Sequence, residues 1–255
     1  MGPASPDPQP PFVPHTIPVV VLSASRLAES AAFYSRVFGW DVRAVSDEIS
    51  VVLAPAGPTM VLRRYGPSGG PAAIPFIQVD EAGQALARVV AAGATVDRLP
   101  YEVPMAGRIT RFADPSGTVY GLTSANPPGA NPPVPMPMGA NPRPMAGTVC
   151  HVELYSRDLS ATAHFFHEQF GWEVTPTTPQ YTAFNPNVGI SGIWQSHTPV
   201  PSALPYIYVA DVNATLAAID AANGRHHGRA VAVPGMATFG YFTDPSGTAM
   251  GLMGR

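Results

Sequence analysis

The sequence predicts an α+β protein made of two copies of one pattern, in which a strand, a helix and three strands follow each other twice per copy. Three observations predict this class. The phrase DPSGT occurs at residues 114–118 and again at 244–248. The segment FYSRVFGWDV at 33–42 aligns with FFHEQFGWEV at 165–174. Around these anchors, strand-like and helix-like periodicities alternate in the same order. Repeats of this length indicate two domains rather than a solenoid.

The first elements of each copy are a strand and an amphipathic helix. Segments 16–24 and 147–156 are rich in β-branched residues, as strands are. In the helix that follows, apolar residues recur at spacings of 4, 3 and 4, which places them on one face. They are Leu27, Ala31, Tyr34 and Phe38 in the first copy, and Leu159, Ala163, Phe166 and Phe170 in the second. Gly39 and Gly171 fit the left-handed position that ends a helix.

The rest of each copy repeats this plan. In the first copy, 49–55 and 59–65 are the clearest of the three strands that follow the helix. Segment 73–79 begins a second series, with a helix from about 84 to 92. The Asp-Pro-Ser-Gly phrase predicts a turn before the last strand, because Asp bonds its own backbone, Pro presets φ and Gly accepts a positive φ.

Prolines divide the chain into segments. Of 31 prolines, many lie in the first 18 residues and in 126–144. Proline fixes φ and lacks an amide donor, so these stretches predict a disordered tail and a semi-extended linker. The expected organisation is a tail at 1–15, a first domain at 16–124, a linker at 125–146 and a second domain at 147–255.

Composition excludes several classes of partner. Charged residues make up 12% of the chain, the net charge is −3 and no basic run occurs, so we expect no nucleic-acid binding. Every apolar stretch is interrupted well before the roughly 20 residues that span a bilayer, so we expect no membrane partner. The single Cys150 and an N-terminus unlike a signal peptide predict a cytoplasmic protein.

The order of these motifs, found twice, resembles the vicinal oxygen chelate superfamily, which includes glyoxalase I, extradiol dioxygenases and bleomycin resistance proteins. The resemblance covers about residues 16–124 and 147–254. Segment 205–224 and the final GLM look most like the tandem glyoxalase-like proteins of actinobacteria. The resemblance implies two tandem glyoxalase-like domains, each of paired βαβββ modules that form a half-open eight-stranded cup with the site inside.

The family's metal-ligand positions are nearly empty of ligands here. Metal-dependent members carry His or Glu on the first strand, often His at the head of the fifth, and Glu on the last. At the first-strand position the second copy has His151 and the first copy has Val19. At the fifth-strand position they have Leu204 and Ile74, and on the last strand Gly251 and Gly121. A catalytic zinc site uses about three protein ligands. One imidazole among six positions therefore predicts no metal and no other cofactor.

His151 and Glu153 are the candidate catalytic residues. They lie two residues apart on one strand, so both side chains, with that of Tyr155, point to the same side. If that side is the cup, they form a titratable pair for acid–base chemistry. The alternative is a buried structural histidine bonded to Glu153 or to backbone. Cys150 alternates with His151, so we expect it to face away.

Aromatic side chains are the candidate ligand contacts, because a cup without metal ligands favours burial and stacking. The residues are Tyr155, Tyr181, Trp194, Tyr206, Tyr208, Phe239 and Tyr241, and Arg63 points either into the first cup or into solvent. We expect a monomer or homodimer that binds a small hydrophobic or aromatic compound, for secondary-metabolite sequestration or self-resistance. The alternatives are a cofactor-independent isomerase, cyclase or hydroxylase-like enzyme and, third, a metal-dependent lyase or dioxygenase.

Overall fold

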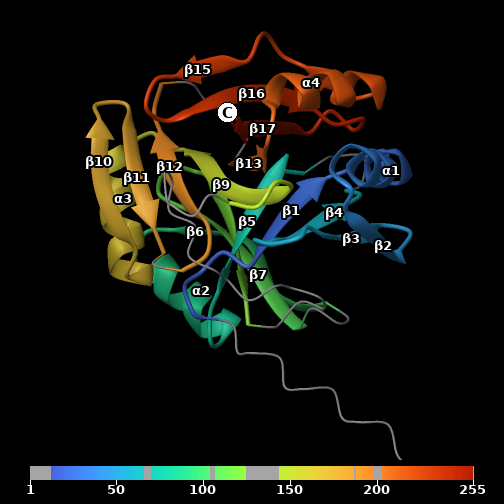
Figure 1. Cartoon of the computed structure of the whole chain (residues 1–255). Coiled ribbons are helices and arrows are strands. Elements are labelled where there is room, and N and C mark those ends of the chain that lie inside the picture. The colour runs from blue at the N-terminus through green and yellow to red at the C-terminus, as the bar shows by residue number, and fades with distance from the viewer. Residues whose placement is uncertain are drawn as a thin grey trace, which may run out of the picture.

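The two copies fold into two sheets that pack together (Figure 1). The computed structural model describes residues 13–65, 70–103, 107–124, 144–186, 188–197 and 203–254. The predicted disordered tail therefore lies outside the described residues except for 13–15, and the predicted linker lies outside them up to residue 143. None of the helices within the described ranges is long and apolar enough to cross a membrane.

The first half contributes two helices, α1 (Leu27–Phe38) and α2 (Ala82–Ala91), to the described ranges. Its strands are β1 (Val19–Ser23), β2 (Asp41–Ser46), β3 (Ile49–Leu53), β4 (Thr59–Arg63), β5 (Ala73–Gln78), β6 (Thr95–Val103), β7 (Gly107–Ala113) and β8 (Val119–Thr123). The Glu81 carboxylate accepts hydrogen bonds from the amides of Gly83 and Gln84. This cap begins α2 two residues before the predicted position.

The second half repeats the series. Its helices are α3 (Leu159–Phe170) and α4 (Val212–Ala221). Its strands are β9 (Thr148–Tyr155), β10 (Glu173–Thr178), β11 (Tyr181–Asn185), β12 (Ser191–Gln195), β13 (Ala203–Val209), β14 (Arg225–His226), β15 (Val231–Val233), β16 (Ala237–Thr243) and β17 (Ala249–Gly254). The counterpart of β6 is split into β14 and β15, with Gly228 at φ 71° between them. As predicted, Gly39 and Gly171 end α1 and α3 in the left-handed conformation.

Strand pairing confirms the predicted modules. The first sheet has the order β2-β3-β4-β1-β5-β8-β7-β6, and the second the order β10-β11-β12-β9-β13-β17-β16-β14 with β15 beside β16. In each sheet the first and fourth strands of a module pair in parallel, and the modules join through antiparallel β1–β5 or β13–β9. The fold is therefore two tandem domains of paired βαβββ modules, whose mixed sheets form cups.

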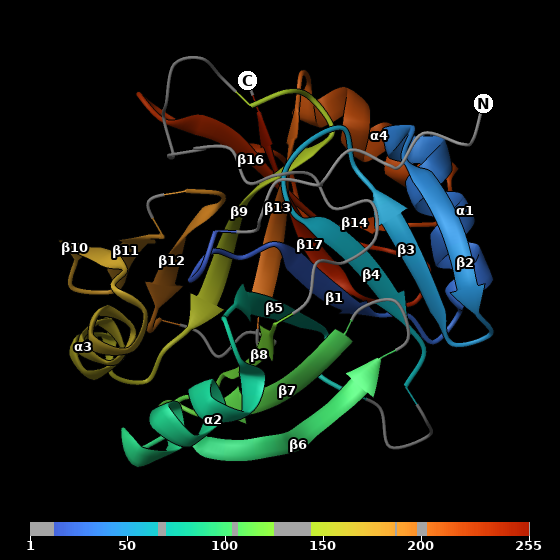
Figure 2. The same cartoon turned by 90° about the horizontal axis from the view of Figure 1, so that it is seen from below.

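Helices α1 and α3 contact the other half as well as the sheet of their own half. Helix α1 lies beside α4 in both views (Figures 1 and 2), and the rings of Phe33 and Phe242 are 6.0 Å apart. On the other side, the Phe165 ring of α3 lies 6.2 Å from that of Phe112 on β7. These contacts join the helix-facing sides of both sheets into one hydrophobic core. The outer face of each sheet is left for its cup.

The repeated DPSGT phrases are turns, as predicted, and they also bind the opposite half. Gly117 and Gly247 take φ values of 89° and 85°. The Ser116 hydroxyl lies 3.0 Å from Thr162 Oγ1 and accepts from the Arg157 amide, both in the second half. The equivalent hydroxyl, of Ser246, accepts from the Arg26 amide and lies 2.8 Å from Ser30 Oγ in the first half. We call these two clusters the latches. They hold the two halves together and are related to each other by pseudo-twofold symmetry.

Candidate functional site

The face of the second sheet that points away from the helices is the candidate site, and we call it the second cup. Cys150, Leu204, Tyr206 and Met253 are buried together on it, and Tyr208 and Phe239 pack against them. The first cup is the equivalent face of the first sheet. It carries an apolar cluster of Val19, Val21, Ile74, Phe76 and Ile109, with Val61, Tyr101 and Val119 against it.

A β-bulge in β9 brings two neighbouring residues into the second cup. The register pairs Tyr206 with His151 and Ile207 with Val149, so Cys150 has no partner of its own. A bulge of this kind interrupts side-chain alternation. The prediction that Cys150 faces away from His151 is therefore wrong, because Cys150 packs in the cup cluster with Tyr206. Burial raises the pKa of the Cys150 thiol to about 12, so it is not a thiolate nucleophile.

His151 lies under Tyr206 and is 3% exposed. Its ring is 5.6 Å from the Tyr206 ring in an edge-on arrangement. Burial lowers the pKa of His151 to about 4, so the imidazole is neutral at pH 7. Its buried Nδ1 has no hydrogen-bond partner among the described residues. His151 is a neutral group under the cup wall, and it makes no hydrogen bond to Glu153, one of the two partners expected for a structural histidine.

Glu153 bonds instead to Tyr206, one member of a tyrosine pair. The Tyr206 hydroxyl donates to Glu153 Oε2 at 2.9 Å, and the Tyr241 hydroxyl lies 3.4 Å from that of Tyr206. Burial raises the pKa of Glu153, while the Tyr206 hydrogen bond and the nearby His197 oppose the increase. Burial and the Glu153 charge also raise the pKa of Tyr206. The cup thus holds the Glu153 carboxylate beside the hydroxyls of Tyr206 and Tyr241.

Tyr181 and His197 extend this wall. Tyr181 alternates with the core residues Thr182 and Phe184 on β11, so it points to the cup side. The Tyr181 hydroxyl and His197 Nε2 are 3.5 Å apart, and the two ring centres are 5.1 Å apart. The sequence places His197 after β12 without indicating this pairing.

The other predicted aromatic contacts divide between the cup and the core. Tyr208 and Phe239 pack on the cup cluster, and half-buried Tyr155 shares the alternation of Glu153 at the end of β9. Trp194 is fully buried on the helix side, where its ring stacks near Trp172 and its Nε1 donates to Tyr120 Oη at 3.0 Å. The prediction that Trp194 lines the cup is wrong, because β12 pairs it with the core residue Leu154.

Glycine on the last strand allows an aromatic ring to cover the family's carboxylate position. Gly251 pairs with Tyr206, and Gly121 pairs with Phe76 in the first half. A Cβ atom at either glycine would overlap the ring of its partner. Among the described residues, no three His, Cys, Asp or Glu side chains lie close enough to hold a metal ion. The donor set does not fit a divalent cation.

Arg63 points into the first cup. On β4 it shares the alternation of the cup residue Val61. Its Nη1 donates to Tyr101 Oη at 3.0 Å, and its guanidinium lies 5.3 Å from the centre of the Tyr65 ring. Arg111, on β7, faces the same cup as Ile109. Sequence reasoning missed Arg111; its alternation with the core residue Phe112 is the signal that places it.

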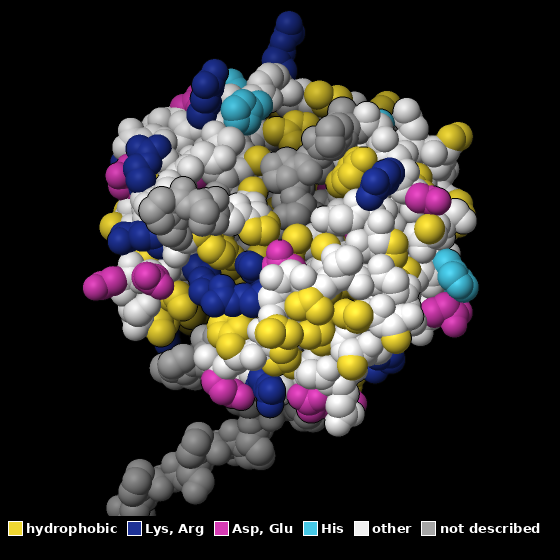
Figure 3. Space-filling view, turned by 180° about the vertical axis from the view of Figure 1, so that it is seen from behind, with side chains coloured by type: hydrophobic (Ala, Val, Ile, Leu, Met, Phe, Trp, Pro, Cys, Tyr) yellow, Lys and Arg dark blue, Asp and Glu magenta, His cyan; other side chains and the backbone are white. Residues whose placement is uncertain are grey.

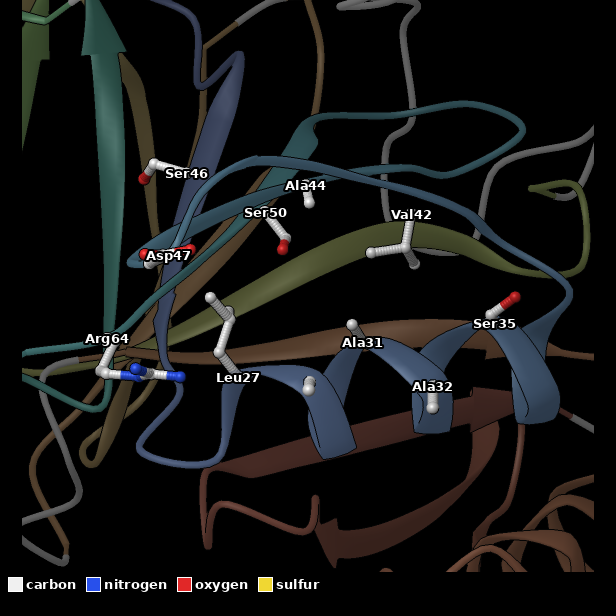
Figure 4. A pocket seen from close by; sticks show the side chains of 11 residues that line it. Leu27, Ala31, Ala32, Ser35, Val42, Ala44, Ser46, Asp47, Ser50 and Arg64 are labelled. Carbon is white, nitrogen blue, oxygen red and sulfur yellow. The ribbon is translucent and has the colours of Figure 1, made fainter.

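A groove of about 620 Å³ lies on the other side of the first sheet, between α1 and the β2–β3 hairpin. Figure 4 shows Leu27 and Ala31 facing Val42 and Ser50 across it, with Asp47 and Arg64 toward one end. Most of its lining residues are Ala or Ser.

Comparisons with known proteins agree with this fold. The model of the Glyoxalase/Bleomycin resistance protein/Dioxygenase superfamily matches residues 16–120 and 148–251. The anthracycline biosynthesis proteins DauV of Streptomyces sp. (strain C5) and DnrV of Streptomyces peucetius are each 27% identical over 169 residues. These matches span 59% of this chain and 58% of each relative.

Two solved structures share the fold. The Mn(II)-bound glyoxalase from Novosphingobium aromaticivorans has a TM-score of 0.70 at 17% identity, over 95% of this chain and 83% of that one. The 2,3-dioxygenase LapB from Pseudomonas sp. KL28 has a TM-score of 0.67 at 15% identity, over 96% of this chain and 92% of that one. With the family match across both halves, the chain belongs to the Glyoxalase/Bleomycin resistance protein/Dioxygenase superfamily.

Proposed function

We propose that this protein binds a planar, largely apolar aromatic compound in the second cup without a metal ion, and so sequesters a secondary metabolite or protects the cell that makes it. The observation that carries the proposal is the Tyr206 ring over Gly251. That ring takes the space of a ligating carboxylate and is itself only 2% exposed, so the aromatic surface open to a ligand belongs to the half-buried Phe239 and to Tyr241, which is 38% exposed. The position of a metal ligand is therefore filled by a ring against which Phe239 and Tyr241 pack.

The surroundings of Tyr206 support an aromatic ligand. The ring of Phe239 stands edge-on to it with centres 6.1 Å apart, and the Tyr241 ring lies at the same distance. Phenol and phenyl groups bury flat molecules with little loss of side-chain entropy. DauV and DnrV are named for anthracycline biosynthesis, and anthracyclines contain fused planar rings. Such a ring system fits the chemistry of this wall.

The test is a calorimetric titration of the full chain with 2-(hydroxymethyl)anthraquinone, a neutral planar probe. We expect one site, and we expect Phe239→Ala to weaken it at least tenfold. Ile109→Ala, at the matching position of the first cup, is the control and should leave the affinity unchanged. Absence of binding, or an equal loss in both variants, would refute the proposal. Elemental analysis of the purified protein tests the metal-free part, which one equivalent of transition metal would refute.

A second candidate function is acid–base catalysis on the same ligand class. The observation that favours it is a carboxylate with a raised pKa beside two hydroxyls, Glu153 with Tyr206 and Tyr241. Such a group removes a proton from carbon next to a carbonyl. Deuterium exchange of 2-tetralone in D₂O, followed by NMR, tests this role. Accelerated exchange that Glu153→Gln abolishes without weakening anthraquinone binding supports catalysis, whereas no acceleration refutes it.

A further inference from the structure

The first cup combines an apolar floor with a cationic wall. Val19, Phe76 and Ile109 belong to the buried cluster of the floor. Arg63 and Arg111 point to the same face from β4 and β7. The chain contains no lysine, so the basic side chains that Figure 3 shows inside a hollow, beside hydrophobic ones, are arginines. Neither the proposed function nor the family's metal chemistry uses these groups.

Arg111 is buried with unused hydrogen-bond donors. Its side chain is 12% exposed, and its Nη2 bonds Asp97 Oδ2 at 2.7 Å. Its Nε and Nη1 are buried and have no partner among the described residues. A buried guanidinium normally has its donors satisfied, because each one left unpaired carries the cost of desolvation. The Tyr65 hydroxyl also lies close to Arg111, but within the described residues these two donors still lack an acceptor.

The charges around Arg111 indicate what charge the missing acceptor carries. Arg63 and Arg111 carry two positive charges, and Asp97 supplies one negative charge at Arg111. Arg98 is exposed and stacks on Tyr101 at 4.4 Å, and Glu48, the acidic side chain that acts on Arg63, is also exposed, so solvent screens both. One positive charge remains unbalanced. A monoanion neutralises it, and a carboxylate matches the planar guanidinium.

We propose that the first cup is a second, independent binding site for an aromatic monocarboxylate, whose ring lies on the Val19–Phe76–Ile109 floor and whose carboxylate is held by Arg111 and Arg63. The phenols of Tyr65 and Tyr101, which both contact Arg63, flank the anion. Strand register matches Val19 of the first cup with His151 of the second, so Val21 corresponds to Glu153. The Glu153 carboxylate therefore disfavours an anionic ligand in the second cup. The two cups are therefore selective for different ligands.

The experiment is a calorimetric titration of the full chain with 2-naphthoate. We expect one site that weakens with added salt, and at least a tenfold loss of affinity in Arg63→Gln and in Arg111→Gln. Arg64→Gln is the matched control: it removes an adjacent arginine that lines the α1 groove instead of the cup, and it should bind like the wild type. If Arg111→Gln fails to fold, the half-buried Arg63 still tests the site.

Further titrations fix the class and place of the ligand. Methyl 2-naphthoate, which lacks the charge, should show no arginine-dependent binding. Naphthyl phosphate, a dianion, should bind more weakly than 2-naphthoate. Glu153→Gln and Phe239→Ala should leave 2-naphthoate binding unchanged. The proposal is overturned if wild-type protein does not bind 2-naphthoate, if the phosphate binds more tightly, or if the second-cup variants abolish binding.

Discussion

The two cups share one strand order and carry opposite charges, although the second has a bulge in β9 and a split counterpart of β6. Strand register matches Phe76 and Arg111, which flank Gly121, with Tyr206 and Tyr241, which flank Gly251. An aromatic ring covers a glycine in both. The first cup adds guanidinium groups, and the second adds a carboxylate among phenols. The fold therefore preserves the ring-over-glycine packing and leaves the charge of each cup free to differ.

The largest expected effect comes from breaking the shared ring-over-glycine packing. Gly251→Ala places a methyl group inside the Tyr206 ring, so we expect a loss of about 3 kcal/mol of unfolding free energy. Gly121→Ala should cost a similar amount against Phe76. Urea denaturation measures both. In a Tyr206→Ala background the cost of Gly251→Ala should largely vanish, and a full cost there would contradict the explanation.

The two turn carboxylates differ in their partners and should differ in pH dependence. Burial raises the pKa of Asp114 to about 6, from 3.8. The folded state therefore binds the Asp114 proton more tightly than the unfolded state does. The resulting stabilisation of the folded state is complete below about pH 4 and is lost as the pH rises through 6. Asp114→Asn should not lose stability in this way, so its unfolding free energy relative to that of the wild type should rise by about 2 kcal/mol between pH 4 and pH 8.

Asp244 is the internal comparison for this pH effect. Its Oδ2 accepts from the Ser30 hydroxyl at 2.7 Å, whereas Oδ2 of Asp114 is buried without a partner in the described structure. Asp244→Asn should therefore gain less than Asp114→Asn. Denaturation curves at several pH values decide the point, and an equal gain in both variants would contradict the role of Ser30.

The two latches should contribute equally to the free energy of unfolding, because they make equivalent contacts. Ser116→Ala and Ser246→Ala each remove a hydroxyl that bonds the opposite half, so each should cost about 1 kcal/mol. Their costs should add, because the hydroxyls belong to separate clusters. Ser160→Ala, at an exposed position on α3, is the control. Chemical denaturation that shows no loss in either latch variant would contradict their contribution.

The smallest expected effect makes one cup more like the other. Tyr206→Phe gives the second cup the residue type of Phe76 and removes the hydrogen bond to Glu153. We expect a loss of about 0.5–1 kcal/mol in stability and a higher pKa for Glu153, because that hydrogen bond stabilises its charged form. NMR titration of the labelled carboxyl measures the pKa. An unchanged or lower value would show that the bond does not stabilise the carboxylate.

Much of the fold could be predicted from sequence because it rests on local patterns. The apolar spacing of Leu27, Ala31, Tyr34 and Phe38 defines α1, and Gly39 ends it. Duplication then predicts the same elements in the second half. The latches could not be predicted, because the contact of Ser116 with Thr162 joins residues from different halves.

The site could be predicted only where strand alternation is regular. Alternation places His151 and Glu153 on the candidate face, whereas the bulge at Cys150 shifts the alternation and has no sequence signal such as glycine. Trp194 illustrates a second difficulty: an aromatic residue fits either face of a sheet, and its pairing with Leu154 decides which. The alternation of its strand predicts which face of the sheet Arg111 is on, but it does not indicate that its hydrogen-bond donors are buried and unpaired.

The central claim is that the two cups bind different ligands independently, and a paired titration tests it most directly. Protein saturated with 2-(hydroxymethyl)anthraquinone is titrated with 2-naphthoate, and the order is then reversed. We predict one equivalent of each ligand and the same dissociation constants in either order. Displacement of one ligand by the other, or binding of only one, would contradict the claim.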